Sequence, residues 1–209
     1  MTEPSHAGRS IEFWFEFGSC YSYLAAMRIE ERARAAGVAV AWRPFLLGPI
    51  FRSFGWDTSP FVLQAAKGRY MWRDLEREAA RLGLPFRRPS VFPRSALLPM
   101  RVATLGAEEP WMGEFCRRVM LKNWADDRDI DNEEAARSAL DGLVPDAGAL
   151  IGAALDPANK LRLRARTEEA QARGIFGAPS FFVGDEMFWG NDRLEAAIDL
   201  ALVGGRPRG

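Results

Sequence analysis

The sequence predicts an α/β fold in which a βαβ unit and an αββα unit are separated by a long helical block. Two aromatic-rich strand patterns flank a helical pattern near the start of the chain. A helix, two short strands and a final helix are indicated near its end. Between these units, helical patterns and turn residues recur without a convincing strand. This is the layout of a thioredoxin-like fold with a large all-helical insertion.

The N-terminal unit begins with residues 11–17, whose aromatic side chains are typical of a mostly buried strand. One helix is predicted over residues 24–36, because apolar residues recur there at spacings of three and four while Arg28 lies on the polar face. Gly37 ends that helix, and residues 38–43 form a second strand. A βαβ unit of this kind places its two strands parallel.

The C-terminal unit begins with a helix over residues 156–173, which opens with a capping Asp-Pro pair. Residues 180–183 form the next strand, and a Gly-Asp turn connects it to residues 186–189, its predicted hairpin partner. Asp192 and Glu195 have the spacing of a capping box, so they are predicted to start the final helix.

Helical patterns in the block between the two units cover residues 70–82, 100–105, 111–124, 133–140 and 147–155. The predicted organisation is a disordered tail at residues 1–10, a thioredoxin-like domain formed by residues 11–49 and 156–203, and a helical insertion domain at residues 50–155.

The composition of the chain argues against several classes of partner and site. The 28 basic residues balance the 28 acidic ones, so no net field draws the chain to nucleic acid or to an anionic membrane. No apolar run approaches the roughly 20 residues that a membrane span needs. Cys20 and Cys116 lie far apart, and nothing around them indicates a disulfide framework or a metal site. We therefore expect a cytoplasmic protein without a metal, a nucleic-acid partner or a membrane partner.

The most informative motif is Ser19-Cys20-Tyr21-Ser22, where the first strand passes through a glycine into a helix. A thioredoxin-type chain carries its Cys-X-X-Cys pair at this junction, so two-sulfur exchange is not available here. His6 is the only histidine and lies in the predicted tail, which excludes Ser-His-Asp and Cys-His catalysis. Ser19 is therefore either a plain N-cap or the donor of a hydrogen bond to an anion, such as a bound thiolate.

Cys20 has two interpretations. A helix N-terminus lowers the pKa of a thiol, which would suit a peroxidase or a redox sensor. The alternative is a buried cysteine that serves only for packing, and no resolving cysteine lies near it in the sequence. Ser22 is a further candidate for the site, whereas Cys116 is predicted to be a packing residue.

The segment Gly177-Ala178-Pro179-Ser180 enters the third strand with a proline at its start. In a thioredoxin layout this loop faces the reactive corner, so we predict a cis bond between Ala178 and Pro179. Ala178 would then present its backbone N–H and C=O to a peptide-like ligand. An ordinary strand-initiating turn is the alternative.

Three polar residues outside the corner are further candidates. Lys67 lies at the head of a helix, where a cation is unfavourable to the dipole, and this indicates an anionic ligand. Asn191 and Asp192 are explained by capping alone, although Asp192 could also pair with the amino group of a ligand.

With these features, the chain resembles the 2-hydroxychromene-2-carboxylate isomerases, relatives of the kappa-class glutathione transferases within the DsbA-like thioredoxin group. The resemblance covers nearly the whole chain. The matching segments are Phe-Trp-Phe-Glu-Phe-Gly-Ser-Cys-Tyr-Ser-Tyr-Leu, Ala-Lys-Gly-Arg-Tyr-Met, Gly-Leu-Pro-Phe-Arg-Arg-Pro, Gly-Ile-Phe-Gly-Ala-Pro-Ser-Phe-Phe-Val and Met-Phe-Trp-Gly-Asn-Asp-Arg-Leu.

The resemblance implies a glutathione cofactor, a homodimer, and a role for Ser19 in holding the glutathione sulfur. The residues that it implies as further glutathione contacts are Lys67, Ala178, Pro179, Asn191 and Asp192. Two positions depart from the family pattern: Cys20 replaces a proline, and the segment Asp57-Thr58-Ser59 stands where relatives carry an asparagine.

The implied function is a glutathione-dependent isomerase of 2-hydroxychromene-2-carboxylate-like aromatic hydroxy-carboxylates, with the glutathione thiolate as a reversible nucleophile. A kappa-type transferase would instead conjugate glutathione to an electrophile. A thiol peroxidase or redox sensor based on Cys20 and a binding module without catalytic activity are the remaining alternatives.

Overall fold

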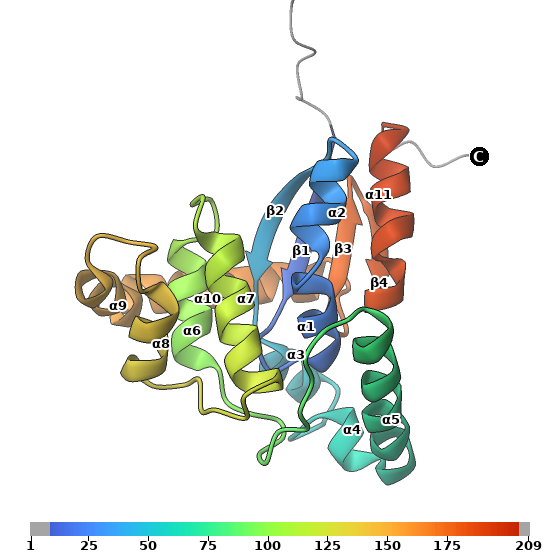
Figure 1. The fold of residues 1–209 in the computed structure, drawn as a ribbon, viewed down its shortest axis with the longest axis horizontal. Helices are drawn as coiled ribbons and strands as arrows, with labels where there is room; N and C mark the ends of the chain where they lie inside the picture. The colour runs from blue at the N-terminus through green and yellow to red at the C-terminus, as the bar shows by residue number, and fades with distance from the viewer. Residues whose placement is uncertain (1–8, 205–209) are drawn as a thin grey trace, which may run out of the picture.

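The computed structural model describes residues 9–204 and contains a four-stranded mixed sheet flanked by helices (Figure 1). The strands are β1 (Ser10–Phe15), β2 (Ala39–Pro44), β3 (Ser180–Val183) and β4 (Glu186–Trp189), and their order in the sheet is β2-β1-β3-β4. β1 and β2 are parallel, whereas β3 is antiparallel to both β1 and β4. The predicted thioredoxin-like fold, parallel pair and hairpin are confirmed. His6 and most of the predicted tail lie outside the described residues.

One face of the sheet is covered by helices from both ends of the chain. Phe13 and Phe15 of β1 point into the larger core, together with residues of α1 (Cys20–Ala26), α2 (Ile29–Ala35) and α11 (Leu194–Leu202). The two phenylalanine rings stack with centroids 5.2 Å apart, a separation typical of favourable aromatic pairs. This face of β1 is therefore buried beneath α1, α2 and α11.

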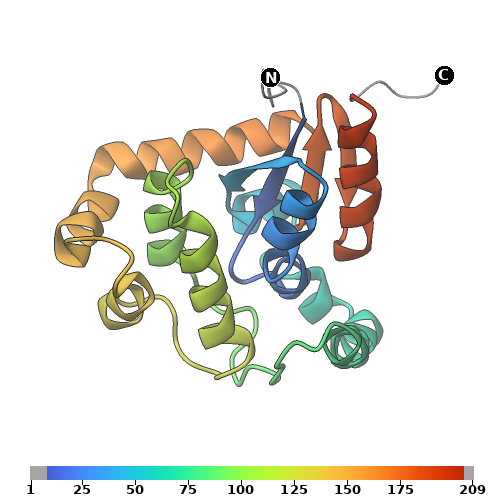
Figure 2. The same cartoon turned by 45° about the horizontal axis from the view of Figure 1, so that its top comes forward.

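The opposite face of the sheet has its own smaller core. Trp14, which alternates with Phe13 and Phe15 along β1, packs there among residues of α3 (Leu47–Ser53) and α10 (Pro157–Ala172). Figure 2 shows α10 running from the helical block across to the sheet. Both faces of β1 are therefore buried, as its aromatic sequence predicts.

The helix predicted over residues 24–36 is in fact two helices, because α1 ends at Ala26 and α2 begins at Ile29. The break falls at Met27 and Arg28, and Arg28 leaves the helical conformation with φ −131°. Arg28 was predicted to lie on the polar face, but its side chain is only 16% exposed. Its guanidinium donates to the backbone oxygen and the side-chain Oδ1 of Asn191, at 2.6 and 2.9 Å.

The capping box predicted at Asp192 and Glu195 does not form. The helix cap at α11 is Arg193 and makes no side-chain hydrogen bond. Glu195 instead forms ion pairs with Arg28 at 3.0 Å and with Arg32 at 2.9 Å. This carboxylate therefore ties α11 to α2 rather than closing its own helix.

Residues between β2 and α10 are entirely helix and loop within the described part of the chain. The helices there, besides α3, are α4 (Pro60–Leu63), α5 (Ala65–Arg81), α6 (Leu97–Leu105), α7 (Met112–Trp124), α8 (Glu133–Leu140) and α9 (Ala147–Leu155). The five predicted patterns correspond to α5–α9, whereas α3 and α4 were not predicted. Figure 1 shows α4 and α5 on one side of α1 and α6–α9 on the other. Among residues 9–204, no helix is both long and apolar enough to cross a bilayer.

Candidate active site

A cavity of about 1170 Å³ lies beside the first residues of α1. Its walls come from α3, α4 and α5, from the loop before β3, and from the short helix η1 (Asn191–Arg193). A cavity of this size is slightly larger than most small-molecule sites, which occupy roughly 300–1,000 Å³.

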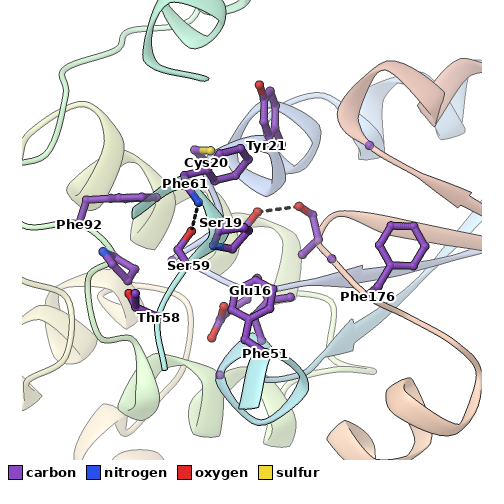
Figure 3. Close-up of a pocket in the computed structure, with 18 of the residues that line it drawn as sticks. Glu16, Ser19, Cys20, Tyr21, Phe51, Thr58, Ser59, Phe61, Phe92 and Phe176 are labelled. Carbon is purple, nitrogen blue, oxygen red and sulfur yellow. Dashed lines mark hydrogen bonds between the residues drawn. The ribbon is translucent and has the colours of Figure 1, made fainter. Parts of the chain in front are cut away.

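Ser19 makes two hydrogen bonds at the edge of this cavity. As the N-cap of α1, its Oγ accepts from the backbone N–H of Ser22 at 3.2 Å. The same hydroxyl donates to the carbonyl oxygen of Ala178 at 2.8 Å, as the dashed line in Figure 3 marks. The residue is only 8% exposed. The predicted N-cap role of Ser19 is therefore confirmed, and its hydroxyl also donates to a backbone carbonyl.

The loop that faces Ser19 has the predicted backbone. The peptide bond between Ala178 and Pro179 is cis. Gly177 precedes it, and a Cβ atom there would lie 2.5 Å from Nε1 of Trp189, so only glycine lets that indole pack against the loop. Trp189 also meets Phe176 edge to face, with centroids 4.8 Å apart. These two half-exposed rings form an aromatic wall of the cavity.

The two cysteines are buried, Cys20 with an exposed fraction of 2%. Burial raises the pKa of Cys20 to about 12, although the backbone N–H groups of Tyr21 and Cys20 itself oppose the shift. The expected lowering by the helix N-terminus is therefore outweighed by desolvation. Burial also raises the pKa of Cys116. Both thiols are protonated at neutral pH.

Comparison with known proteins places the chain in a family. Residues 10–200 match the DSBA-like thioredoxin domain. A 2-hydroxychromene-2-carboxylate isomerase of Sphingobium xenophagum is 32% identical over 189 residues, which cover 90% of this chain and 95% of the relative. The chain belongs to the 2-hydroxychromene-2-carboxylate isomerase family. This result confirms the predicted resemblance and supports an isomerase enzyme.

Two further proteins are similar to this chain over nearly its whole length. A solved structure of a 2-hydroxychromene-2-carboxylate isomerase superposes with a TM-score of 0.81 at 27% identity, covering 91% of this chain and 94% of that one. Glutathione s-transferase kappa 2 of Caenorhabditis elegans is 26% identical over 204 residues, which cover 91% of this chain and 90% of the relative. The likeness to this transferase and to the isomerases therefore extends over nearly the whole chain.

Lys67 lies at the cavity rim of this isomerase-family chain because α5 packs tightly on α4. A Cβ atom at Gly68 would lie 2.2 Å from the backbone oxygen of Phe61, so glycine permits the close approach. The Nζ atom of Lys67 lies 5.8 Å from the centroid of the Phe61 ring. Tyr21 of α1 joins the same wall by donating to Asp74 at 2.9 Å. Lys67 is exposed and lines the cavity.

The remaining predicted site residues differ in their surroundings. Asn191 is 4% exposed and its Oδ1 accepts from Arg28, so it holds η1 in place. Asp192 is exposed on the cavity rim. Pro179 accepts a 3.0 Å hydrogen bond from the Gly190 N–H, which joins η1 to the loop before β3. Ser22 is fully buried, and its Oγ has no hydrogen-bond partner within the described residues.

Sequence reasoning missed Glu16, which lines the cavity beside Ser19. Burial raises the pKa of this carboxyl to about 7, against a partial opposing effect of the Leu47 backbone N–H. The signal was a lone carboxylate in the aromatic run Phe-Trp-Phe-Glu-Phe. Ser59 was missed as a contributor as well: it caps α4 by accepting from the Phe61 N–H at 3.3 Å.

Proposed function

We propose that this protein is a glutathione-dependent isomerase that acts on aromatic hydroxy-carboxylates like 2-hydroxychromene-2-carboxylate. Ser19 would hold the glutathione sulfur as a thiolate. The observation that carries the proposal is the Ser19 hydroxyl at the cavity edge, 2.8 Å from the carbonyl before the cis-proline, where a redox relative has a thiol. The names of the relatives supply the reaction and the type of cofactor.

The residues around the cavity suit a peptide thiol with charged ends. Ala178 presents its backbone beside Ser19, and its N–H donates no hydrogen bond among the residues that the structure describes. Lys67 and Asp192 place an ammonium group and a carboxylate on the rim. Glutathione carries two carboxylates and one ammonium group, so both rim charges would find partners of opposite sign.

When bound, glutathione would supply a thiolate that adds reversibly to a conjugated double bond and leaves unchanged after rotation about that bond. Ser19 contributes a hydrogen-bond donor aimed at this sulfur, for which its hydroxyl turns away from the Ala178 carbonyl. A preorganised donor of this kind stabilises a developing anion in a site with little water. Phe176 and Trp189 provide an apolar wall against which an aromatic substrate would lie.

A kappa-type glutathione transferase is the second candidate, favoured by the likeness to the kappa 2 transferase. The two reactions differ in the fate of the thiol. A transferase consumes glutathione and accumulates a conjugate, whereas an isomerase recovers it. The thiol peroxidase based on Cys20 is disfavoured, because burial raises the pKa of that thiol to about 12.

The test measures isomerisation of 2-hydroxychromene-2-carboxylate with and without glutathione, and counts the free thiol before and after. We expect product only with glutathione and no loss of thiol. Ser19→Ala should reduce kcat/KM by about 100-fold or more. Ser138→Ala, which removes an exposed hydroxyl in α8, is the control.

The proposal fails if the wild-type protein does not bind glutathione, or if Ser19→Ala turns over the substrate as fast as the wild type. Steady accumulation of a conjugate would favour the transferase instead. The homodimer and the cytoplasmic location remain predictions.

A further inference from the structure

Glu16 is held against the segment that carries Ser19. Its backbone oxygen accepts a 3.1 Å hydrogen bond from the Ser19 N–H. Its side chain turns into the same cavity, and its Oε2 lies 3.9 Å from the position that a Cβ atom would take on Gly18. In the view of Figure 3, Glu16 lies between Ser19 and Phe51. The carboxyl is surrounded by protein but keeps access to the cavity.

No cation neutralises this carboxyl. Glu16 takes part in no ion pair within residues 9–204. The other titratable and charged side chains that line the cavity are Cys20, Tyr21, Arg52, Asp57, Lys67, Tyr70, Asp74, Glu78, Arg81, Arg94, Asp192 and Arg193. Of these, Arg94 already pairs with Asp127, and the thiol of Cys20 is protonated.

An anion that enters this cavity would therefore face an unpaired carboxylate. Two negative charges at close range in a poorly hydrated site repel each other, and one proton shared between them removes most of the cost. Burial already raises the pKa of Glu16 to about 7, so its carboxyl accepts a proton readily near neutral pH. The Ser19 hydroxyl can donate a hydrogen bond to the anion, but it is too weak a base to take up the proton.

We propose that Glu16 takes up the proton that the glutathione thiol loses when the sulfur is held at Ser19, and keeps it while the thiolate is in place. This inference rests on the proposed function. The S–H bond breaks, an O–H bond forms on the Glu16 carboxyl, and nothing is oxidised or reduced. The net charge of the loaded cavity thus stays the same, and the proton is returned when the thiol leaves.

Proton counting tests the assignment without any measurement of turnover. Glutathione is added to the protein in weakly buffered solution with a pH indicator, and the ultraviolet absorption of the thiolate is recorded in parallel. At about pH 8, where Glu16 is mostly ionised, the wild type should form thiolate and release close to no protons per site. At about pH 6, Glu16 already carries a proton, so each thiolate formed should release about one.

Variants of Glu16 test whether this carboxyl is the group that takes up the proton. Glu16→Gln should release about one proton per thiolate at both pH values, or lose the thiolate absorption. Glu16→Asp should keep part of the wild-type retention at about pH 8. The control Asp199→Asn removes an exposed carboxyl of α11 that does not line the cavity, so this variant should release as many protons per thiolate as the wild type does.

The assignment is overturned if the wild type releases about one proton per thiolate at about pH 8, or if Glu16→Gln retains the proton as the wild type does. The wild-type pH series decides the matter even if Glu16→Gln fails to fold. A wild type that binds no glutathione, or that forms no thiolate, would overturn the proposed function, and the role of Glu16 with it.

Discussion

Ser19 and Ala178 meet across the edge of the cavity, where the serine hydroxyl donates a 2.8 Å hydrogen bond to the alanine carbonyl. The two residues are 159 positions apart in the sequence. In the ligand-free protein this bond satisfies both groups, and a neutral bond of this kind contributes about 0.5–1.5 kcal/mol. A ligand that accepts the Ser19 hydrogen bond leaves the Ala178 carbonyl without a donor. Unless the ligand supplies that donor, its binding free energy is less favourable by about the same 0.5–1.5 kcal/mol.

Gly68→Ala should destabilise the protein and weaken glutathione binding. Alanine favours a helix over glycine by about 1 kcal/mol, but its Cβ would lie 2.2 Å from the Phe61 oxygen. Moving α5 from α4 to relieve the clash should cost roughly 1–3 kcal/mol and displace Lys67. Urea unfolding measures the change. In the control Gly152→Ala, a Cβ meets nothing within 4 Å on α9, so that variant should gain up to about 1 kcal/mol.

Arg28→Met should lower the free energy of unfolding by about 2–3 kcal/mol. The substitution keeps the apolar stem but removes the charged hydrogen bonds to Asn191 and Glu195. Arg32→Met is the control, because the Arg32 side chain is 54% exposed although it also pairs with Glu195. That loss should stay below about 1 kcal/mol. Equal effects of the two substitutions would show that the contact with Asn191 does not stabilise the fold.

Native protein should react slowly with a thiol reagent at neutral pH, because both cysteines are buried and their pKa values are raised. Both should react quickly after unfolding in urea. Cys20→Ala should keep isomerase activity and lose about 1 kcal/mol of stability from the lost packing. Rapid labelling of Cys20 in the native state, with loss of activity, would revive the redox interpretation.

The contribution of Glu16 to the free energy of unfolding should decrease as the pH rises from about 4.5 to about 7. The pKa of Glu16 is raised from 4.5 to about 7 in the fold, so the native state holds a proton that the unfolded chain has lost in this window. Glu16→Gln removes this dependence. The difference in unfolding free energy between variant and wild type should shift by on the order of 2 kcal/mol in favour of the variant between about pH 5 and pH 8. Urea unfolding without glutathione measures it, and parallel curves would contradict the prediction.

The sheet was predictable because its information is local. The aromatic run of β1 and the short turn between β3 and β4 each contain their own signal. The cis bond at Pro179 was predictable from its place in the layout. The break between α1 and α2 was not, because Arg28 leaves the helix to reach Asn191, which lies 163 positions further on.

The site was only partly predictable for a similar reason. Ser19, Ala178 and Lys67 all line the cavity, as the motifs indicated. Glu16 was visible in the sequence as a lone carboxylate, but its altered acidity depends on burial, which no short motif encodes. The capping box was predicted wrongly for the same reason. Glu195 pairs with Arg28 and Arg32, which are distant in the sequence, instead of capping its own helix.

The order of the strands has a consequence for synthesis of the chain on the ribosome. β1 is an inner strand, and β2 can join it within the first 44 residues, but its other edge pairs with residues 180–182. Until those residues emerge, a nascent chain presents an aromatic strand with one open edge, the kind of edge that pairs with other chains. We expect a chain that stops before residue 180 to aggregate, even though it contains Ser19 and the whole helical block.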